Sequence, residues 1–412
     1  MATALFIVGA FAAVAIALSL WPPRTPAIAA FVAFLIALPI TELPFHAALG
    51  LLAIAVPLSL AGALAHTIGL VGLALVLAGL LGLAQHVRLA THTTAIVERA
   101  LKAGLGRDYH DAIAAELRAV YDPTTSWRAL AGIWPWCPRG VVRTRDIVYG
   151  RVGNRDLRLD ILRRTDLARP APVFVYVHGG AWILGHKRQQ GHVTMHELAA
   201  AGWVCVAIDY RLSPRATFPD HLDDVRTALA WVQRNIRDHG GDPGFVMIGG
   251  GSAGAHLASL AALTARAPAA GEPDLRVQGC VAYYGVYDFA DRDRAFRHRM
   301  FRMILERVVL KRRFADEPDR FDAASPVAQL HADAPPFLVV HGDRDSIAPL
   351  AGAARFVDAY RTVARAPLVW ISLPGAQHMF EWFPSLRSVP VVHGVHRFCQ
   401  AIYSRHRATR SA

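Results

Sequence analysis

Residues 246–254 read VMIGGGSAG, a short apolar run that leads directly into a glycine-rich turn around Ser252. The turn fits the pattern G-x-S-x-G, and a segment with helical spacing follows at 253–265. Small residues on both sides of a serine allow a sharp strand-to-helix turn that presents the hydroxyl at the helix N-terminus. Glycine-rich turns are common, but the position of this one between a strand and a helix strengthens the prediction.

The segments around this turn alternate between strand-like and helical patterns. Short apolar runs lie at 173–177, 204–208, 281–284, 337–340 and 368–371. Helical stretches such as 221–236 lie between most of them, and two strand-like segments at 147–152 and 157–162 come first. Continuous apolar strands that alternate with helices are typical of a mostly parallel sheet covered on both faces. The sequence therefore predicts an α/β domain over 141–412, with its site at the carboxyl ends of the strands.

A second glycine-rich motif, HGGAW at 178–182, follows the apolar run at 173–177. Glycines let backbone N–H groups approach and point at a substrate oxygen. We therefore expect the N–H groups of Gly179, Gly180 and Ala253 to form an oxyanion hole, which stabilises negative charge in a transition state.

A serine nucleophile needs a general base, and the base needs a group that orients it. Candidates follow the last two predicted strands: HGDRD at 341–345 contains two aspartates, and SLPGAQH ends at His378. The pattern predicts Ser252 as the nucleophile and His378 as the base. Asp345 is the predicted orienting carboxylate, and Asp343 is the competing acid.

These motifs resemble those of the hormone-sensitive-lipase-like esterases, which have the α/β-hydrolase fold. The resemblance runs from residue 141 to about 405 and rests on HGGAW at 178–182, DYRLSP at 209–214 with FP at 218–219, GGDP at 240–243, GGSAG at 250–254 and GDRD at 342–345. The GxxD spacing of that group favours Asp345 over Asp343, and the order Ser, Asp, His matches the fold. The sequence departs from the pattern at Ala181, where many relatives have a third glycine, and this narrows the oxyanion loop.

The whole layout resembles membrane-anchored mycobacterial Lip-type carboxylesterases and plant isoprenylcysteine methylesterases. The resemblance implies a membrane-anchored serine carboxylesterase or lipase that hydrolyses esters through an acyl-Ser252 intermediate, without a cofactor. An acyltransferase or an isoprenylcysteine-methylesterase-like enzyme could use the same triad. A non-catalytic receptor on this fold is a remote alternative, because the related gibberellin receptors lack the catalytic histidine that His378 provides here.

The N-terminal part of the chain is far more apolar than the rest. Residues 1–86 contain only two charged side chains, Arg24 and Glu42. A helix needs about 20 apolar residues to cross a bilayer. Uncharged stretches at 1–21, 25–41 and 43–86, the last folded back near 63–69, predict four transmembrane helices, with three as the alternative. The first stretch lacks the basic n-region of a signal peptide.

Basic residues predict how this membrane region is oriented. Arg88, Arg99, Lys102 and Arg107 follow the last apolar stretch, whereas Arg24 stands alone in the first loop. Since arginine and lysine are enriched in cytoplasmic loops, we expect a multi-pass protein of the cell membrane with its catalytic domain in the cytoplasm.

The remaining features suggest contact with lipid rather than with nucleic acid. The net charge of +12 comes without the aromatic and basic platform that nucleic-acid binding uses. Residues 87–140 are predicted as a helical linker or cap, with Trp127, Trp134 and Trp136 at the membrane interface or packed in the linker. The basic stretch at 292–313 predicts an amphipathic helix that docks on a membrane surface or caps the site.

Several other side chains are candidates for roles at or near the site. Residues that follow strand ends or flank the triad either line the acyl pocket or belong to the core: Trp182, Tyr283, Tyr284, Met379 and Phe380. No carboxylate or cysteine completes a metal site with His186, His192 and His196, so no metal is expected. Cys205 and Cys280 lie in strand runs and are predicted core residues.

The location of the motifs also predicts what truncation does. All of them lie after Val141. Removal of residues 1–86 should therefore leave a folded domain that hydrolyses short soluble esters and loses activity on lipid esters in vesicles.

Overall fold

A computed structural model of the 412-residue chain describes all residues except 119–129, 135–136, 168–169, 297–298 and 412. An eight-stranded sheet forms the centre of the globular part, in the order β1-β2-β4-β3-β5-β6-β7-β8. β1 pairs with β2 and β2 with β4 in antiparallel fashion, and every other neighbouring pair is parallel. The strands are β1 (Val141–Val152), β2 (Arg155–Arg164), β3 (Ala171–Val177), β4 (Val204–Ile208), β5 (Gly241–Gly251), β6 (Gly279–Tyr283), β7 (Phe337–Gly342) and β8 (Leu368–Leu373).

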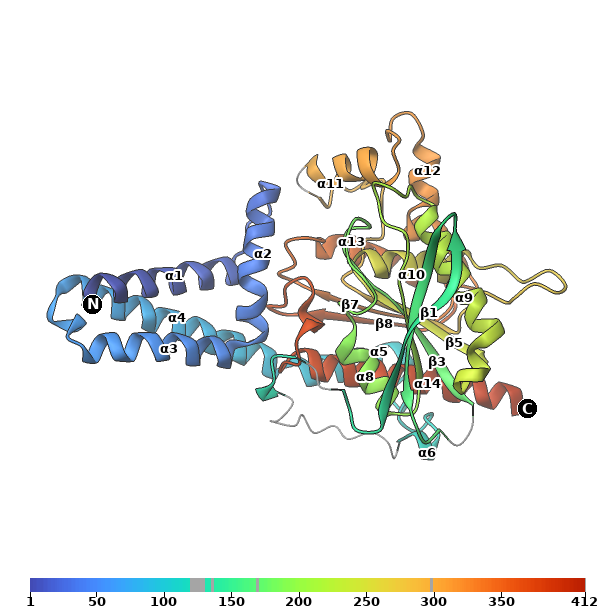
Figure 1. Cartoon of the computed structure of the whole chain (residues 1–412), viewed down its shortest axis with the longest axis horizontal. Helices are drawn as coiled ribbons and strands as arrows, with labels where there is room; N and C mark the ends of the chain where they lie inside the picture. Colours follow the sequence, from blue (N-terminus) through green and yellow to red (C-terminus); the bar gives the residue numbers. More distant parts are fainter. Residues whose placement is uncertain (119–129, 135–136, 168–169, 297–298, 412) are drawn as a thin grey trace.

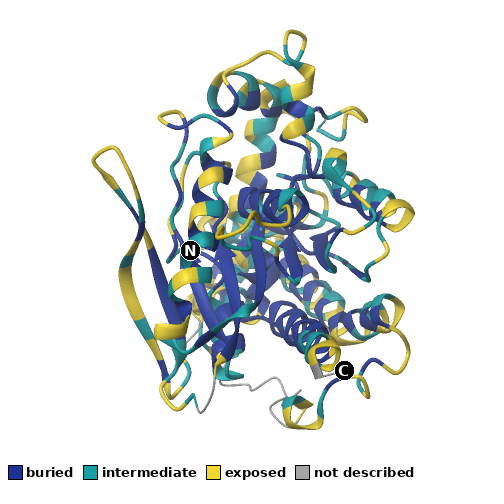
Figure 2. Cartoon of the chain, turned by 90° about the vertical axis from the view of Figure 1, so that its right-hand side faces the viewer, coloured by how far each residue is buried: buried dark blue, intermediate teal, exposed yellow. Residues whose placement is uncertain are grey.

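Helices cover both faces of this sheet, as the continuous apolar strands require (Figure 2). One face packs against α5 (Thr93–Leu105), α8 (His192–Ala200) and α14 (Ser388–Ser411). The other packs against α9 (Asp220–Asn235), α10 (Ala253–Thr264) and α13 (Leu350–Val363). Shorter elements are α6 (Ala115–Arg118), η2 (Ile236–His239), α11 (Arg299–Ile304), η3 (Leu305–Val309), α12 (Pro318–Ala323), η4 (Pro326–Gln329) and η5 (Phe380–Trp382). The predicted α/β-hydrolase architecture is therefore present.

The apolar N-terminal region projects from this domain as an arm (Figure 1). Its helices are α1 (Ala2–Leu20), α2 (Ala27–Glu42), α3 (Pro44–Leu60) and α4 (Thr67–Thr91), with η1 (Ala63–Ala65) at the far end. α1, α3 and α4 lie alongside one another, whereas α2 stands across the end of the arm against the globular domain. Close packing of α1 on α4 depends on glycine, because a Cβ at Gly72 would lie 2.6 Å from the backbone nitrogen of Phe6.

The arm differs from the predicted set of four spans. By length and composition, α1 and the continuous stretch of α4 and α5 can cross a membrane, and α2 with α3 forms a pair bent by 95°. The described residues thus offer two spans, or three if the bent pair counts as one. The physical reason is the 95° bend between α2 and α3, which turns α2 across the end of the arm while α3 lies alongside α1 and α4.

Two other predicted segments differ from the structure. α5 was expected in a linker, but Val97 and Leu101 are fully buried against the core that includes β8 and α14. Among the described residues of the basic stretch, the helical part runs from Arg299 to Val309, in α11 and η3. Trp127 and Trp136 lie outside the described residues, whereas the ring of Trp134 lies 5.6 Å from that of Phe383.

Candidate active site

Ser252 occupies a sharp turn between β5 and α10. Its φ of 55° lies in the left-handed region, which strains a residue with a side chain. The turn also needs glycine around it, because the end of β3 packs directly on it. A Cβ would lie 2.4 Å from the carbonyl oxygen of Val177 at Gly250 and 2.0 Å from the same oxygen at Gly254. This packing places Ser252 next to the motif that follows β3.

Two further side chains meet Ser252 from the ends of β7 and β8. The Nε2 atom of His378 lies 3.0 Å from Ser252 Oγ, and its Nδ1 atom lies 2.7 Å from Asp345 Oδ2. The other carboxylate oxygen of Asp345 accepts the backbone N–H groups of Ile347 and Ala348 at 2.8 and 2.7 Å. The structure therefore brings together the serine, the histidine and the aspartate that the sequence singled out.

The charge state of Asp345 follows from its surroundings. Burial by itself would raise the pKa of this carboxyl, but the charge of His378 and hydrogen bonds from His341 and His378 outweigh burial and lower it. Asp345 is thus ionised at neutral pH, as an orienting group must be. Asp343 does not reach His378: it accepts the backbone N–H of Gly375 at 2.8 Å and is partly exposed.

Gln377 is a supporting residue that the sequence analysis missed. Its side-chain oxygen accepts the backbone N–H groups of Ser346 and His378, each at 2.8 Å. One buried amide therefore ties the loop of the acid to the loop of the base. The sequence holds no local signal for this contact, because 31 residues separate Gln377 from Ser346.

The predicted oxyanion hole needs one correction. The backbone N–H of Gly179 donates to the side-chain oxygen of Gln190 at 2.7 Å, so it is not available to a substrate. Within the described residues, the N–H groups of Gly180 and Ala253 donate to no other group of the protein. Ala181 and Trp182 follow with φ of 52° and 62°, and these values hold the loop in a strained conformation.

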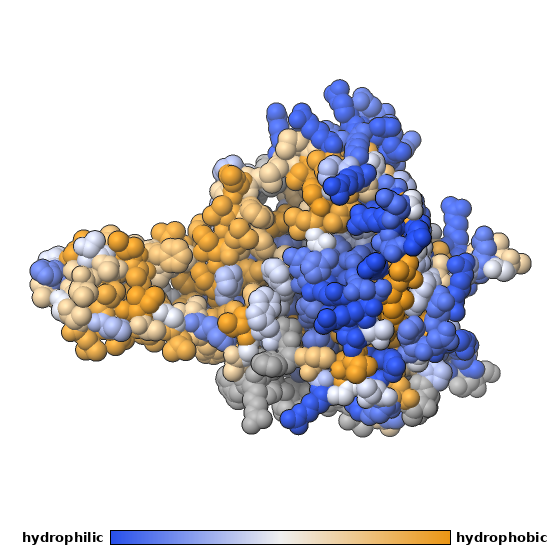
Figure 3. Space-filling view, viewed as in Figure 1, coloured by the Kyte–Doolittle hydropathy of each residue, from blue (hydrophilic) through white to orange (hydrophobic). Residues whose placement is uncertain are grey.

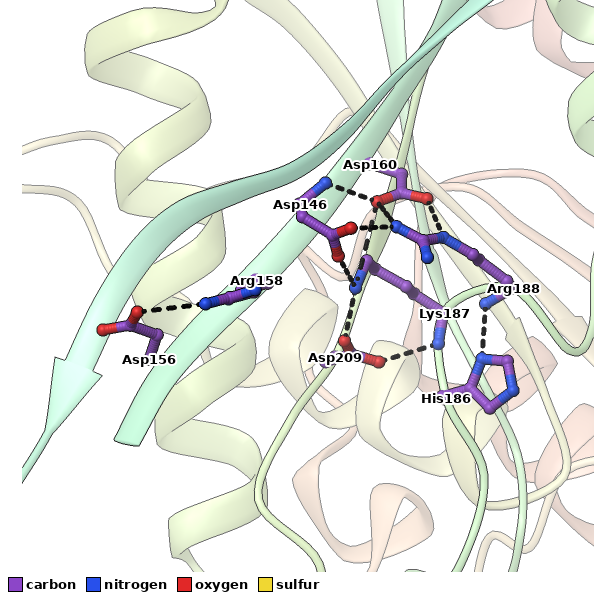
Figure 4. Close-up of polar contacts among 8 residues, drawn as sticks. All are labelled: Asp146, Asp156, Arg158, Asp160, His186, Lys187, Arg188 and Asp209. Atoms are coloured by element: carbon purple, nitrogen blue, oxygen red, sulfur yellow. Dashed lines mark hydrogen bonds and ion pairs between the residues drawn. The ribbon is translucent and has the colours of Figure 1, made fainter. Parts of the chain in front are cut away.

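A partly buried ionic cluster holds this loop against the sheet (Figure 4). Lys187, which is only 6% exposed, places its Nζ 2.7 Å from Asp209 and 3.0 Å from Asp146. Arg188 donates to Asp160 and Asp146, each at 2.6 Å. Lys187 and Asp160 are the buried members of the cluster, and a buried charge that loses its partner is costly. The aspartate of the DYRLSP motif therefore anchors the oxyanion loop.

Two histidines near this cluster contact the backbone of Arg188. His186 Nδ1 accepts the backbone N–H of Arg188 at 3.2 Å, and His192 Nε2 lies 2.6 Å from the carbonyl oxygen of the same residue. Across the described part of the chain, no group of three or more His, Cys, Asp or Glu side chains is placed to hold a metal ion.

A cavity of about 250 Å³ opens at Ser252, and its lining includes parts of the arm. Trp182 lines it as predicted, with its Nε1 donating to His256 at 3.1 Å. The other four residues expected either in the pocket or in the core do not line this cavity and belong to the core or pack against it: Tyr283, Tyr284, Met379 and Phe380. They lie behind the triad instead, and the ring of Tyr284 lies 4.6 Å from that of His378.

Comparison with known proteins assigns the chain to a family. The chain is 42% identical over 344 residues to the probable carboxylic ester hydrolase LipM of Mycobacterium tuberculosis, covering 80% of this chain and 77% of LipM. The chain belongs to the family of Lip-type carboxylic ester hydrolases. Esterase LipQ of the same organism is 44% identical over 279 residues, which cover 66% of this chain and 65% of LipQ, just under two thirds of that protein. Residues 159–360 match the family described as BD-FAE.

More distant relatives agree with the fold of this Lip-type esterase. The isoprenylcysteine alpha-carbonyl methylesterase ICME of Arabidopsis thaliana is 32% identical over 239 residues, which cover 55% of each chain. A carbohydrate esterase from gut microbiota superposes with a TM-score of 0.53 at 21% identity, covering 63% of this chain and 96% of that one. Butyrate-bound esterase 2 of Thermogutta terrifontis superposes with a TM-score of 0.51 at 24% identity, covering 61% and 90%. These structural likenesses establish the fold alone.

The arm of this Lip-type esterase is joined to the catalytic domain by buried contacts. Glu42 at the end of α2 pairs with Arg387 at 2.5 Å, and both side chains are at most 1% exposed. Ser346 Oγ donates to the carbonyl oxygen of Ala30 at 3.0 Å, and the ring of Phe34 lies 6.0 Å from that of His378. These contacts argue against the expectation that residues 1–86 can be removed without affecting the site, because α2 forms one wall of it.

Glu381 is a buried carboxyl behind the triad that the sequence analysis also missed. It accepts hydrogen bonds from the hydroxyl groups of Tyr284 and Tyr176. Burial raises the pKa of Glu381 to about 7, against the lowering effect of the Tyr284 hydrogen bond. The folded protein therefore binds this proton more tightly than the unfolded chain does.

This linkage predicts how stability depends on pH. Because the pKa of Glu381 is higher in the folded state, its contribution to the free energy of unfolding falls as pH rises from about 4.5 to about 7. Glu381→Gln should remove that part of the dependence, which amounts to roughly 3 kcal/mol at 1.36 kcal/mol per pKa unit. The test is the difference in thermal midpoint between pH 4.5 and pH 8.5 for wild type and variant in detergent. The same difference in both proteins would contradict the assigned pKa.

Proposed function

We propose that this Lip-type esterase is a membrane-anchored serine carboxylesterase that works through Ser252, His378 and Asp345. One observation carries the proposal: a single imidazole lies 3.0 Å from the serine hydroxyl and 2.7 Å from a buried carboxylate. Within that geometry the imidazole can accept a proton on one nitrogen while the other stays hydrogen-bonded to the acid.

The first half of the reaction forms the acyl-enzyme. Ser252 Oγ attacks the ester carbonyl carbon while His378 Nε2 takes the hydroxyl proton. The negative charge that develops on the carbonyl oxygen is stabilised by the N–H groups of Gly180 and Ala253. When the carbon–oxygen bond to the alcohol breaks, His378 returns the proton to the leaving alkoxide, which departs as the alcohol.

The second half regenerates the enzyme. Water replaces the alcohol, and His378 takes one of its protons as the oxygen attacks the acyl carbon. The tetrahedral intermediate collapses to a free carboxylic acid, and His378 gives the proton back to Ser252 Oγ. Asp345 stays ionised throughout, because its role is to fix the tautomer and stabilise the imidazolium.

The arm supports a membrane location. Its helices expose large apolar side chains such as Phe11, Leu49 and Leu81. Soluble proteins rarely expose an apolar surface of this extent to water. The arm is mostly orange and tan in Figure 3, whereas much of the globular domain is blue. We infer that α1, α3 and α4 cross the bilayer and that α2 lies along its surface. With three spans, the N-terminus and the catalytic domain lie on opposite sides of the membrane.

Charge supports the placement of the catalytic domain in the cytoplasm. Arg88, Arg99 and Lys102 follow the apolar part of α4, and arginine and lysine are enriched on that side. Arg299, Arg307 and Lys311 are exposed on or next to α11 and η3, and no carboxylate of the described residues forms an ion pair with them. Attraction to anionic lipid contributes about 1 kcal/mol for each such residue near the surface.

Product analysis tests whether water is the acceptor. The detergent-solubilised protein is incubated with p-nitrophenyl butyrate, with and without a short primary alcohol as a competing acceptor. We expect butyric acid as the main product in both cases, and its formation should require Ser252. A predominance of the butyryl ester of the added alcohol would instead identify an acyltransferase.

A further inference from the structure

The outer wall of the catalytic cavity is built by two helices from opposite ends of the sequence. Ala27, Ala30 and Phe31 of α2 line it together with Met300, Phe301 and Ile304 of α11, and Ser252 lies in the same lining. Phe31 and Met300 are 49% and 39% exposed although they line the cavity. These two side chains therefore stand at its mouth, where α2 and α11 approach each other.

The surface around this mouth is apolar and continuous with the arm. Ile28, Phe31 and Leu35 recur on α2 at the spacing of one helix face, and all three are exposed, Ile28 by 72%. The opposite face of α2 packs against the protein through Ala30, Ala33 and Ala37. Met303 of α11 is also exposed. In Figure 3 the orange surface of the arm continues over α2 up to the region of α11.

The size of the cavity limits what it can enclose. An apolar cavity of about 150 Å³ holds one benzene molecule. The cavity at Ser252, at about 250 Å³, therefore accepts only a short part of an acyl chain. The rest of a long chain has to leave through the mouth between α2 and α11, where the neighbouring surface is the one that faces the bilayer.

We propose that the substrate is a membrane-resident lipid ester with a long acyl chain, which reaches Ser252 directly from the bilayer by passing between α2 and α11. This inference rests on the proposed esterase function and membrane anchoring. α2 then has two roles, because its inner face closes the pocket and its outer face keeps the mouth in contact with lipid. Only the end of the substrate that carries the ester leaves the bilayer, and the remote part of its chain stays in an apolar environment.

The test changes the outer surface without touching the cavity lining. Ile28→Glu on α2 and Met303→Glu on α11 place a charge beside the mouth, where an apolar environment disfavours it. Val363→Glu, at a similarly exposed valine near the end of α13, is the matched control. Each full-length protein is reconstituted in phosphatidylcholine vesicles that contain 4-methylumbelliferyl oleate, and is assayed separately on soluble p-nitrophenyl acetate.

We expect each glutamate variant at the mouth to lose about tenfold or more of the oleate rate, because a charge on the apolar surface around the mouth weakens its contact with lipid. The acetate rate should stay within about twofold of wild type, as the lining and triad are unchanged. The Val363→Glu control should keep both rates. The proposal is overturned if both mouth variants cleave the oleate ester at the wild-type rate. It is also overturned if they lose oleate and acetate hydrolysis equally. The outer face of α2 and α11 would then be needed for the structure of the pocket and not for entry from lipid.

These outcomes are separate from a failure of the esterase proposal. That proposal fails if the wild-type protein does not hydrolyse acetate, or if it does so without Ser252. Acetate hydrolysis that depends on Ser252, combined with unchanged oleate hydrolysis in the mouth variants, would leave the esterase in place and reject entry from the bilayer.

Discussion

Replacing Ser252 with alanine should reduce kcat for p-nitrophenyl butyrate by about 10⁶-fold, the scale on which loss of a nucleophilic serine acts in such triads. Ser252 Oγ lies 3.0 Å from His378 Nε2, and without this oxygen no acyl-enzyme can form. The residual rate should come from the oxyanion hole and substrate binding. Initial rates at saturating substrate in detergent provide the measurement.

A matched control comes from the same helix. Ser259 is another buried serine of α10, and Ser259→Ala should keep kcat within a few-fold of wild type. If Ser252→Ala retained more than a few per cent of the wild-type rate, another residue would have to be the nucleophile, and the arrangement around His378 would need a different explanation.

Replacing Asp345 with asparagine should lower kcat by about 10⁴-fold, because an amide in place of the carboxylate favours the wrong tautomer of the base. Asp345 lies 2.7 Å from His378 Nδ1 and is buried, so no solvent group can replace it. The comparison is with Asp343→Asn. Asp343 accepts the backbone N–H of Gly375, which asparagine can also accept, and it lies 3.8 Å from the partly exposed guanidinium of Arg344.

The two variants together decide between the aspartates. We expect Asp343→Asn to cost no more than about tenfold in kcat, as a substitution on a partly exposed loop contact does. Comparable Tm values for both variants would show that the difference is catalytic. A larger loss with Asp343→Asn than with Asp345→Asn would contradict the geometry in which Asp345 orients His378.

The sequence predicted the parts of the site that depend on short segments. Ser252, Asp345 and His378 each follow an apolar strand within a few residues, so strand pattern and motif together place them at one edge of the sheet. The glycines of the turn around Ser252 are needed because β3 packs closely on it, and this local requirement is visible in the sequence as a glycine-rich motif. For the same reason the α/β-hydrolase fold could be predicted from residue 141 onward.

The contacts that the sequence did not reveal all join distant segments. Gln190 accepts a hydrogen bond from the N–H of Gly179, and Glu381 accepts one from the hydroxyl of Tyr284. Neither pair of residues has a fixed spacing in the sequence that would reveal the contact. The position of α2 was missed because uniform hydropathy does not say which apolar helix crosses a bilayer. Two prolines do indicate where α2 begins and ends. Pro26 precedes α2 and Pro44 begins α3, which limits α2 to 16 residues.

Covalent labelling of the nucleophile tests the central claim most directly. The full-length protein in detergent is treated with a fluorophosphonate probe, digested, and mapped by mass spectrometry, alongside the Ser252→Ala and Ser259→Ala variants. The account predicts one probe adduct per chain on Ser252 in the wild type and in Ser259→Ala, complete loss of ester hydrolysis on labelling, and no adduct in Ser252→Ala. An adduct on another residue that accompanies inactivation, or full activity in a chain labelled at Ser252, would contradict it.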